Sequence, residues 1–314
     1  MSIIKQLKFN YPIIQGGMAV RVSTASLAGA VASAGGIGII GATGMSEDEL
    51  RFEIKEARKI ASNGIIGVNI MYAVRNFANL AVIALQEKID LIITGAGFSR
   101  DIFGMGNKAG IPIISIVSTA RLAKIAEKYG AAAVVAEGSE AGGHLGTDRS
   151  IKDILPEIRS AVKIPVIAAG GITDHHDIEE VMDLGANGVQ MATRFVLSEE
   201  CNVAPSFKEL YLKASKEDVV IIKSPVGLPG RAIKNSFTEA LERGERSKID
   251  CDSCLKECSR DYCILEALEN SRLGEIDKGI IFSGQNVYRI KSILSVKQII
   301  DMLSPAFKGA VNRL

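Results

Sequence analysis

The segment after the apolar run at 131–136 carries the residues best suited to proton chemistry. It reads Glu-Gly-Ser-Glu-Ala-Gly-Gly-His-Leu over residues 137–145 and contains His144, one of only three histidines in the chain. Small residues at the end of a strand let the backbone approach a ligand closely, and an imidazole exchanges a proton near neutral pH. The pattern is typical of an active-site loop. The alternative is a glycine turn followed by a surface histidine without a function, because such a turn has the same pattern.

Eight short apolar runs must position this loop. Each run ends in glycine or a polar turn, and segments of helical period separate them, such as 46–61, where Ser46 and Glu49 have capping-box spacing, and 120–129. Continuous apolar strands separated by helices indicate a parallel sheet that is buried on both faces. The runs are 12–17, 36–41, 64–71, 91–97, 111–117, 132–137, 164–169 and 188–193.

This alternation predicts an α/β protein with a closed (β/α)8 barrel, the TIM barrel, whose active site lies at the C-terminal ends of the strands. An open, doubly wound sheet is the alternative. We expect the barrel to occupy residues 1–200. Residues 201–314 are expected to form a C-terminal extension with a substrate loop, a cysteine cluster and closing helices.

Composition favours a small-molecule partner. The 314 residues are 47% hydrophobic and 23% charged, which is enough for a large core, and the net charge of +1 leaves no basic surface for a nucleic acid. No apolar run reaches the roughly 18 residues of a membrane span, and the N-terminus lacks the apolar centre of a signal peptide. We therefore expect a cytoplasmic protein without a membrane or nucleic-acid partner.

Two strand ends point to a phosphate group. In a TIM barrel the loops after strands seven and eight usually bind phosphate through exposed amides and a helix N-terminus. Gly170 and Gly171 lie in the first loop, before Thr173 and Asp174, which are able to cap the next helix, and residues 190–194 end the last strand. Paired glycines also occur where the chain packs tightly at the rim of a barrel, and this is the alternative interpretation of Gly170 and Gly171. A phosphate site beside an apolar, glycine-lined pocket suggests FMN.

Five segments together resemble the nitronate monooxygenase (2-nitropropane dioxygenase) superfamily, which includes the type II flavin-dependent enoyl-ACP reductases. The resemblance covers about residues 8–240 and is specific because the glycine-histidine segment and the two phosphate motifs occur in order. The segments are Gln-Gly-Gly-Met at 15–18, Gly-Val-Asn-Ile at 67–70, Glu-Gly-Ser-Glu-Ala-Gly-Gly-His at 137–144, Ala-Ala-Gly-Gly-Ile at 168–172 and Gln-Met-Ala-Thr-Arg at 190–194.

The resemblance implies a barrel that binds FMN, with His144 in the position of the catalytic histidine. Residues at the strand ends would line the isoalloxazine ring, and those after strands seven and eight would hold the phosphate. The cofactor-binding residues implied in this way are Gly16, Gly17, Met18, Asn69, Glu137, Gly142, Gly143, Gly170, Gly171, Gln190, Met191, Ala192 and Thr193. A homodimer is also expected.

The two branches of the superfamily differ in chemistry. Monooxygenases tend to have Gln-Gly where this chain has Glu137 and Gly138, as the reductases do, and the segment at 15–18 also resembles the reductases more. We therefore expect hydride transfer from NADH or NADPH through FMN to an enoyl thioester, free or carrier-bound, with His144 placing the substrate carbonyl or aiding proton delivery. The alternatives are a nitronate monooxygenase, in which His144 is the base, and a flavin-binding module without turnover.

Other polar residues have simpler interpretations. His175 and His176 follow Asp174 at the start of an expected helix, where polar side chains cap and face solvent. Arg194 either supports the phosphate or forms a structural ion pair. Arg231 is expected on a flexible turn that matches a reductase substrate loop, where it meets either a phosphorylated carrier or solvent.

Four of the five cysteines are clustered in a part of the chain that departs from the family pattern. Cys251, Cys254, Cys258 and Cys263 have the spacing Cys-x2-Cys-x3-Cys-x4-Cys. Because a cytoplasmic location disfavours disulfides, the thiolates are candidate ligands of zinc or an iron-sulfur cluster. The spacing is similar to that of the cluster loop in iron-sulfur 2,4-dienoyl-CoA reductases. A helix that packs its cysteines as small apolar side chains is the alternative.

Overall fold

The computed structural model describes residues 9–245 and 251–307. Its central element is a closed barrel of eight parallel strands in which β9 pairs with β1, so the open-sheet alternative is wrong and the predicted TIM barrel is confirmed. Each of the eight apolar runs contributes one strand. The barrel strands are β1 (Ile13–Gln15), β2 (Ile37–Gly41), β3 (Ile65–Met71), β4 (Leu91–Gly95), β5 (Ile113–Val117), β6 (Ala133–Glu137), β8 (Val166–Ala169) and β9 (Gly188–Met191).

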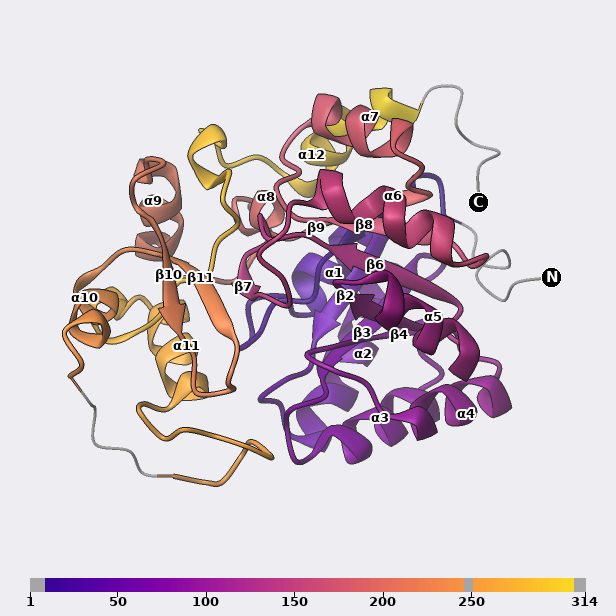
Figure 1. Cartoon of the computed structure of the whole chain (residues 1–314), viewed down its shortest axis with the longest axis horizontal. Helices are drawn as coiled ribbons and strands as arrows, with labels where there is room; N and C mark the ends of the chain where they lie inside the picture. Colours follow the sequence, from indigo (N-terminus) through magenta and orange to yellow (C-terminus); the bar gives the residue numbers. More distant parts are fainter. Residues whose placement is uncertain (1–8, 246–250, 308–314) are drawn as a thin grey trace.

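Helices surround the barrel (Figure 1), and their ends follow local sequence rules. Ser46 and Glu49 form the predicted capping box at the start of α2, and Thr119 caps α5 through the amide of Leu122. Asp174 caps α7. The barrel helices are α1 (Ala25–Ser33), α2 (Glu47–Ile60), α3 (Phe77–Gln86), α4 (Arg100–Ala109), α5 (Ala120–Tyr129), α6 (Ile151–Ala161), α7 (His175–Asp183) and α8 (Thr193–Val196).

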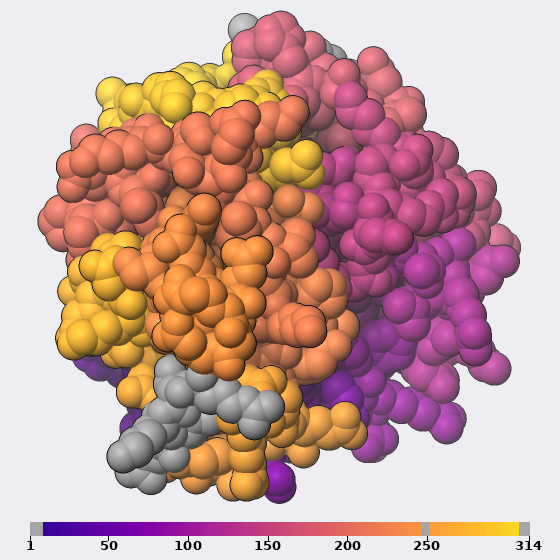
Figure 2. Space-filling view, turned by 60° about the vertical axis from the view of Figure 1, so that its left-hand side comes forward, coloured from indigo at the N-terminus to yellow at the C-terminus, as the bar shows by residue number. Residues whose placement is uncertain are grey.

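A second group of elements forms a lobe beside the barrel, drawn mostly in orange in Figure 1 and filling one side of the surface in Figure 2. Its three-stranded sheet has the order β10-β11-β7, so a short strand from the glycine-histidine segment is incorporated into the lobe. The lobe elements are β7 (Gly143–His144), α9 (Pro205–Lys213), β10 (Val219–Lys223), β11 (Pro229–Ile233), α10 (Ser236–Glu242), α11 (Ile264–Arg272), η2 (Ile276–Lys278) and η3 (Val287–Arg289).

The chain then returns to the barrel. Helix α12 (Val296–Leu303) packs on α1, α7 and α8, and η4 (Ser304–Phe307) packs on α7. Helix α12 lies in the layer of helices around the barrel, at a place where α8, with only four residues, covers little of the strands. The predicted boundary near residue 200 remains a prediction, but residues 296–307 lie on the barrel. Among the described residues, no helix is both long and apolar enough to cross a membrane.

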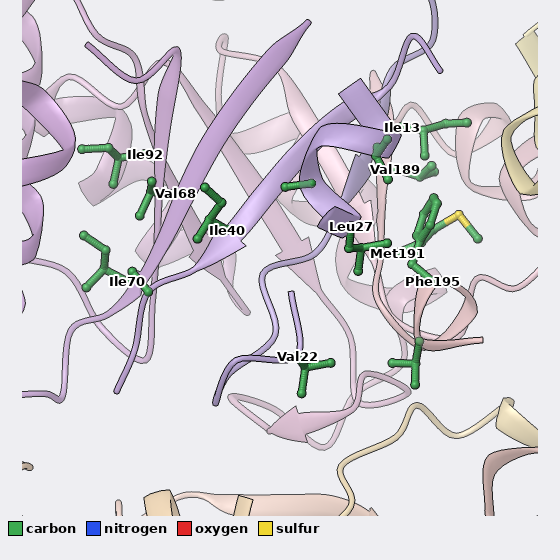
Figure 3. Packing of buried hydrophobic residues seen from close by; sticks show 14 of the residues in the cluster. Ile13, Val22, Leu27, Ile40, Val68, Ile70, Ile92, Val189, Met191 and Phe195 are labelled. Atoms are coloured by element: carbon green, nitrogen blue, oxygen red, sulfur yellow. The ribbon is translucent and has the colours of Figure 1, made fainter. Parts of the chain in front are cut away.

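Two apolar layers hold the barrel, as expected for strands buried on both faces. Alternate residues point inward, such as Ile14 and Ile39, and the intervening residues point toward the helices. Figure 3 shows part of the outer layer, which includes Ile13, Ile40 and Leu27. The strand ends are therefore rigidly placed, which is what a site at the barrel mouth requires.

A glycine in this outer layer gives a test of the packing. A Cβ at Gly38 in β2 would lie 1.8 Å from the carbonyl oxygen of Ala28 in α1. Gly38→Ala should therefore lower the free energy of unfolding by about 1–3 kcal/mol, the usual cost of overpacking, and lower Tm by several degrees. Gly104→Ala in α4 is the control, because nothing lies within 4 Å of its added Cβ. An unchanged Tm for Gly38→Ala would contradict the packing of β2 on α1.

Candidate active site

A cavity opens at the C-terminal ends of the strands, between the barrel and the lobe. Its lining includes most of the residues that the sequence predicted, and these come from four segments far apart along the chain. The predicted residues in the lining are Gly16, Gly17, Met18, Asn69, Glu137, Gly142, Gly143, His144, Gln190, Ala192 and Thr193.

The other three predicted residues, Gly170, Gly171 and Met191, lie behind this lining. Gly170 and Gly171 have φ of +105° and +74°, a backbone conformation that favours glycine. The Met191 side chain is 2% exposed and belongs to the outer apolar layer, while its carbonyl accepts a hydrogen bond of 2.8 Å from the amide of Gly16. The side chain of Met191 therefore has a packing role, and its backbone positions the loop after β1.

Two of the cavity glycines are required by neighbouring protein atoms. A Cβ at Gly17 would lie 2.3 Å from Cβ of Asn69, and a Cβ at Gly142 would lie 2.5 Å from the carbonyl carbon of Ser283. Glycine at these positions allows loops from different parts of the chain to meet closely. The sequence predicted an approach to a ligand, and the structure shows that the same residues also close the cavity wall.

His144 joins the barrel loop to the lobe. It pairs with Gly230 of β11, its Nε2 lies 2.8 Å from Oγ of Ser224, and its ring packs edge-on against Phe282 at 5.1 Å. Burial lowers the pKa of His144 to about 4. The imidazole is therefore neutral near pH 7 and is able to accept a proton or a hydrogen bond.

Glu137 ends β6 and lines the same cavity. Burial raises its pKa to about 7, because a carboxylate enclosed by protein loses hydration. Near neutral pH a carboxyl that is about half protonated and a neutral imidazole thus share one cavity. Ionisable groups whose pKa values are displaced in opposite directions are typical of a catalytic site.

Two buried polar atoms of the lining have no hydrogen-bond partner within the described structure. They are Oε1 of Gln190 and Oγ of Ser283. Leaving such atoms unpaired costs free energy, and a ligand with complementary polar groups removes that cost. Polar flavin ring edges and ribityl hydroxyls are such groups, so these residues fit the cofactor that the resemblance implies.

Residues 282–286 were missed by the sequence analysis. The amide of Gly284 donates to Oγ1 of Thr193 at 2.9 Å, and Nδ2 of Asn286 donates to the carbonyl of Gly171 at 2.7 Å. This segment therefore connects the loops after β8 and β9, the two predicted phosphate loops. The only sequence signal was the run Ile280-Ile-Phe-Ser-Gly284, which resembles the other strand ends.

The two arginines act within the protein. Nη2 of Arg194 donates to the carbonyls of Leu197 and Ser292, both at 2.7 Å, and burial lowers its pKa to about 10. Arg231 lies in β11, where its guanidinium donates to the carbonyl of Ser139 at 2.7 Å. The expectation of a flexible turn at Arg231 is wrong, because that residue pairs with Gly143 in the lobe sheet.

The other two histidines lie outside the cavity, as expected. His175 and His176 begin α7, and His176 is exposed. The N-terminal end of α7 is held by Arg289, which forms ion pairs with Asp174 at 2.6 Å and Asp177 at 2.9 Å.

The four clustered cysteines are free thiols. Cys251 and Cys258 are exposed, and Cys254 and Cys263 are half-buried. In residues 9–245 and 251–307, no group of three or more His, Cys, Asp or Glu side chains is placed to hold a metal ion. Zinc or an iron-sulfur cluster therefore gains no support from the structure.

The segment that carries these cysteines is fixed to the loop after β3. The amide of Arg75 donates to the carbonyl of Cys254 at 2.9 Å, and the amide of Lys256 donates to Ala73 at 2.8 Å. The Lys256 ammonium lies 3.4 Å from the centre of the Tyr72 ring, at the distance of a cation-π contact. These contacts also hold the lobe to the barrel.

The chain matches the family model described as "Nitronate monooxygenase" over residues 2–81 and 61–305. The chain belongs to the nitronate monooxygenase family. Membership makes it a flavin-dependent oxidoreductase, and it excludes the interpretation as a binding module without turnover.

Proteins with different names are similar to this chain. A probable nitronate monooxygenase of Staphylococcus aureus is 32% identical, over 77% of this chain and 81% of that protein. A bicyclic indene-carboxyl-CoA dehydrogenase of Mycobacterium tuberculosis is 31% identical, over 76% of this chain and 67% of its own length. The solved structure of FabK from Thermotoga maritima has a TM-score of 0.88 and 34% identity, covering 99% of this chain and 97% of that one.

The displaced pKa of Glu137 predicts a change of stability with pH. The folded state binds this proton more tightly than the unfolded state, so the stabilisation by the neutral carboxyl is complete below pH 4.5 and is lost as the pH rises through about 7. Glu137→Gln mimics the neutral form. Its Tm relative to wild type should therefore rise between pH 4.5 and 7 at matched flavin content.

The contribution of His144 has the opposite sign, but it is present in both proteins and cancels in this difference. Glu217→Gln, at an exposed loop position, serves as the control. A constant difference in Tm between Glu137→Gln and wild type would show that Glu137 is not held in a desolvated cavity.

Proposed function

We propose that this chain is an FMN-dependent reductase that transfers hydride from NADH or NADPH to the β-carbon of an enoyl thioester, free or carrier-bound. The observation that carries the proposal is the match to FabK over nearly the whole chain, including the lobe that covers the cavity. The match to the Staphylococcus aureus protein covers 77% of the chain. A relative named for a carboxyl-CoA substrate also supports a thioester.

The residues of the cavity support this proposal in specific ways. The loops at Gly171 and Thr193 hold the FMN phosphate, with residues 284–286 fixing their separation. Oε1 of Gln190 and Oγ of Ser283 provide hydrogen-bonding atoms for the cofactor. When bound, FMN supplies the acceptance of hydride from the nicotinamide and its delivery to the unsaturated carbon.

Glu137 and His144 give the cavity its electrostatic character. The carboxyl of Glu137, with its pKa raised to about 7, is about half protonated near neutral pH and so places less negative charge beside the cofactor than an ordinary carboxylate. His144, with its pKa lowered to about 4, is neutral and lines the same cavity. The lobe covers part of the cavity and so limits the access of water to the reacting atoms, which strengthens the polar contacts that position the substrate.

Nitronate monooxygenase activity is the second candidate. It is favoured by the name of the Staphylococcus aureus relative and by the neutral imidazole of His144, which is able to remove the α-proton of a nitroalkane. The two activities need the same cavity, so a comparison of substrates has to separate them.

The purified protein should release FMN on denaturation and should oxidise NADH or NADPH anaerobically when crotonyl-CoA or an enoyl-ACP is added. The control omits the thioester and should show at most slow oxidation of the nicotinamide. Consumption of propyl nitronate and oxygen, with no turnover of enoyl thioesters, would overturn the reductase proposal in favour of the monooxygenase.

A further inference from the structure

His144 has a partner in the lobe that the sequence analysis did not identify. Its Nε2 lies 2.8 Å from Oγ of Ser224, which follows β10 and is 8% exposed. A serine hydroxyl both donates and accepts, so this contact alone permits either neutral tautomer of the imidazole. The direction of the hydrogen bond depends on what else holds the serine.

A second residue, Tyr262, sets that direction. Its hydroxyl donates to the carbonyl of Lys223 at 3.1 Å, and its ring is 2% exposed and packs edge-on against Phe237 at 5.7 Å. Tyr262 also has a side-chain hydrogen bond with Ser224. A phenol has a single hydrogen, and a carbonyl only accepts. The phenol oxygen must therefore accept from Ser224.

The rest of the chain of hydrogen bonds follows from this step. Ser224 has one hydrogen, which it gives to Tyr262, so its oxygen accepts the contact with His144. The Nε2 atom of His144 then carries the hydrogen, and Nδ1 keeps its lone pair.

We propose that Ser224 and Tyr262 are positioning residues that hold His144 in the tautomer protonated at Nε2, so that Nδ1 accepts a hydrogen bond from the substrate. The site therefore selects a donor at this position, and a thioester carbonyl does not bind there. If the proposed reductase function holds, the donor is an amide N–H of a pantetheine arm or of the nicotinamide carboxamide. This role differs from both alternatives that the sequence analysis gave for His144, which were placing the substrate carbonyl and aiding proton delivery.

The lobe keeps this chain of hydrogen bonds in place. The amide of Gly227 donates to the carbonyl of Ser224 at 3.0 Å, and the amide of Ser259 donates to Pro225 at 3.0 Å. Tyr262 lies in the segment between Cys258 and Cys263, just before α11. The cysteine-bearing segment thus presents the tyrosine to the turn that holds Ser224.

Nitrogen-15 NMR of the FMN-loaded enzyme at pH 7 tests the proposal, since the two tautomers give different ring-nitrogen shifts and the chain has only three histidines. His144→Ala assigns the signals. Wild type should show His144 protonated at Nε2. In Tyr262→Phe, Ser224 is free to donate to Nε2, so the ratio of tautomers should move toward Nδ1–H by about fivefold or more, as expected for one hydrogen bond.

Matched variants separate this effect from a general loss of structure. Tyr129→Phe in α5 removes a phenol hydroxyl outside the cavity and should leave the His144 signals unchanged. Ser224→Ala should also shift the tautomer ratio, while Ser224→Thr, which keeps the hydroxyl, should restore it. The two Ser224 variants decide the question even if Tyr262→Phe does not fold.

An Nδ1–H tautomer in wild type, or unchanged signals in both Ser224→Ala and Tyr262→Phe, would overturn the proposal. The measurement needs no turnover, so it is independent of the reductase assay. If the enzyme proves to be inactive on enoyl thioesters and the Nε2–H tautomer is found, the proposal stands with a different donor, the acidic C–H of a nitroalkane.

Discussion

The pairing of β7 with β11 is the constraint on which the site depends. Through it the glycine-histidine segment leaves the barrel mouth and becomes the edge of the lobe sheet, with His144 opposite Gly230. The barrel and the lobe are thereby joined over the cavity, and the contacts of the 254–256 segment with the loop after β3 join them at a second place. Enclosure by this second layer displaces the pKa values of His144 and Glu137 in opposite directions.

The barrel and the lobe have different roles in this arrangement. Strands buried on both faces fix the positions of Gln190, Asn69 and Glu137 to the precision of a packed core. The lobe supplies what the barrel lacks, namely a cover, the segment that bridges the phosphate loops, and the hydrogen-bond partner of the histidine. A barrel mouth without the lobe would leave His144 in water, where an imidazole has no fixed orientation.

The sequence predicted the barrel and most of the cavity because both depend on local patterns. Eight apolar runs with glycine ends are sufficient to indicate the strands, and the fold then brings the ends of those strands together. Ser224, Tyr262 and Ser283 carried no comparable signal, since they reach the site through contacts between distant parts of the chain. His144 and Ser224 are 80 residues apart, and Tyr262 and Lys223 are 39 residues apart. Arg231 was misplaced for the same reason, because the pairing of β11 with β7 joins distant parts of the chain.

The central claim is that His144 acts on the substrate from a neutral, enclosed position while the cofactor is held by other residues. The most direct test is the rate at which the reduced flavin of His144→Ala is reoxidised by the best substrate, compared with wild type. Without the imidazole a buried donor of the substrate is left unpaired, which costs about 1–3 kcal/mol, so a loss of about 5–150-fold with an unchanged flavin spectrum is predicted. A loss below about fivefold, or loss of the flavin itself, would contradict the account, because His144 would then not be holding the substrate.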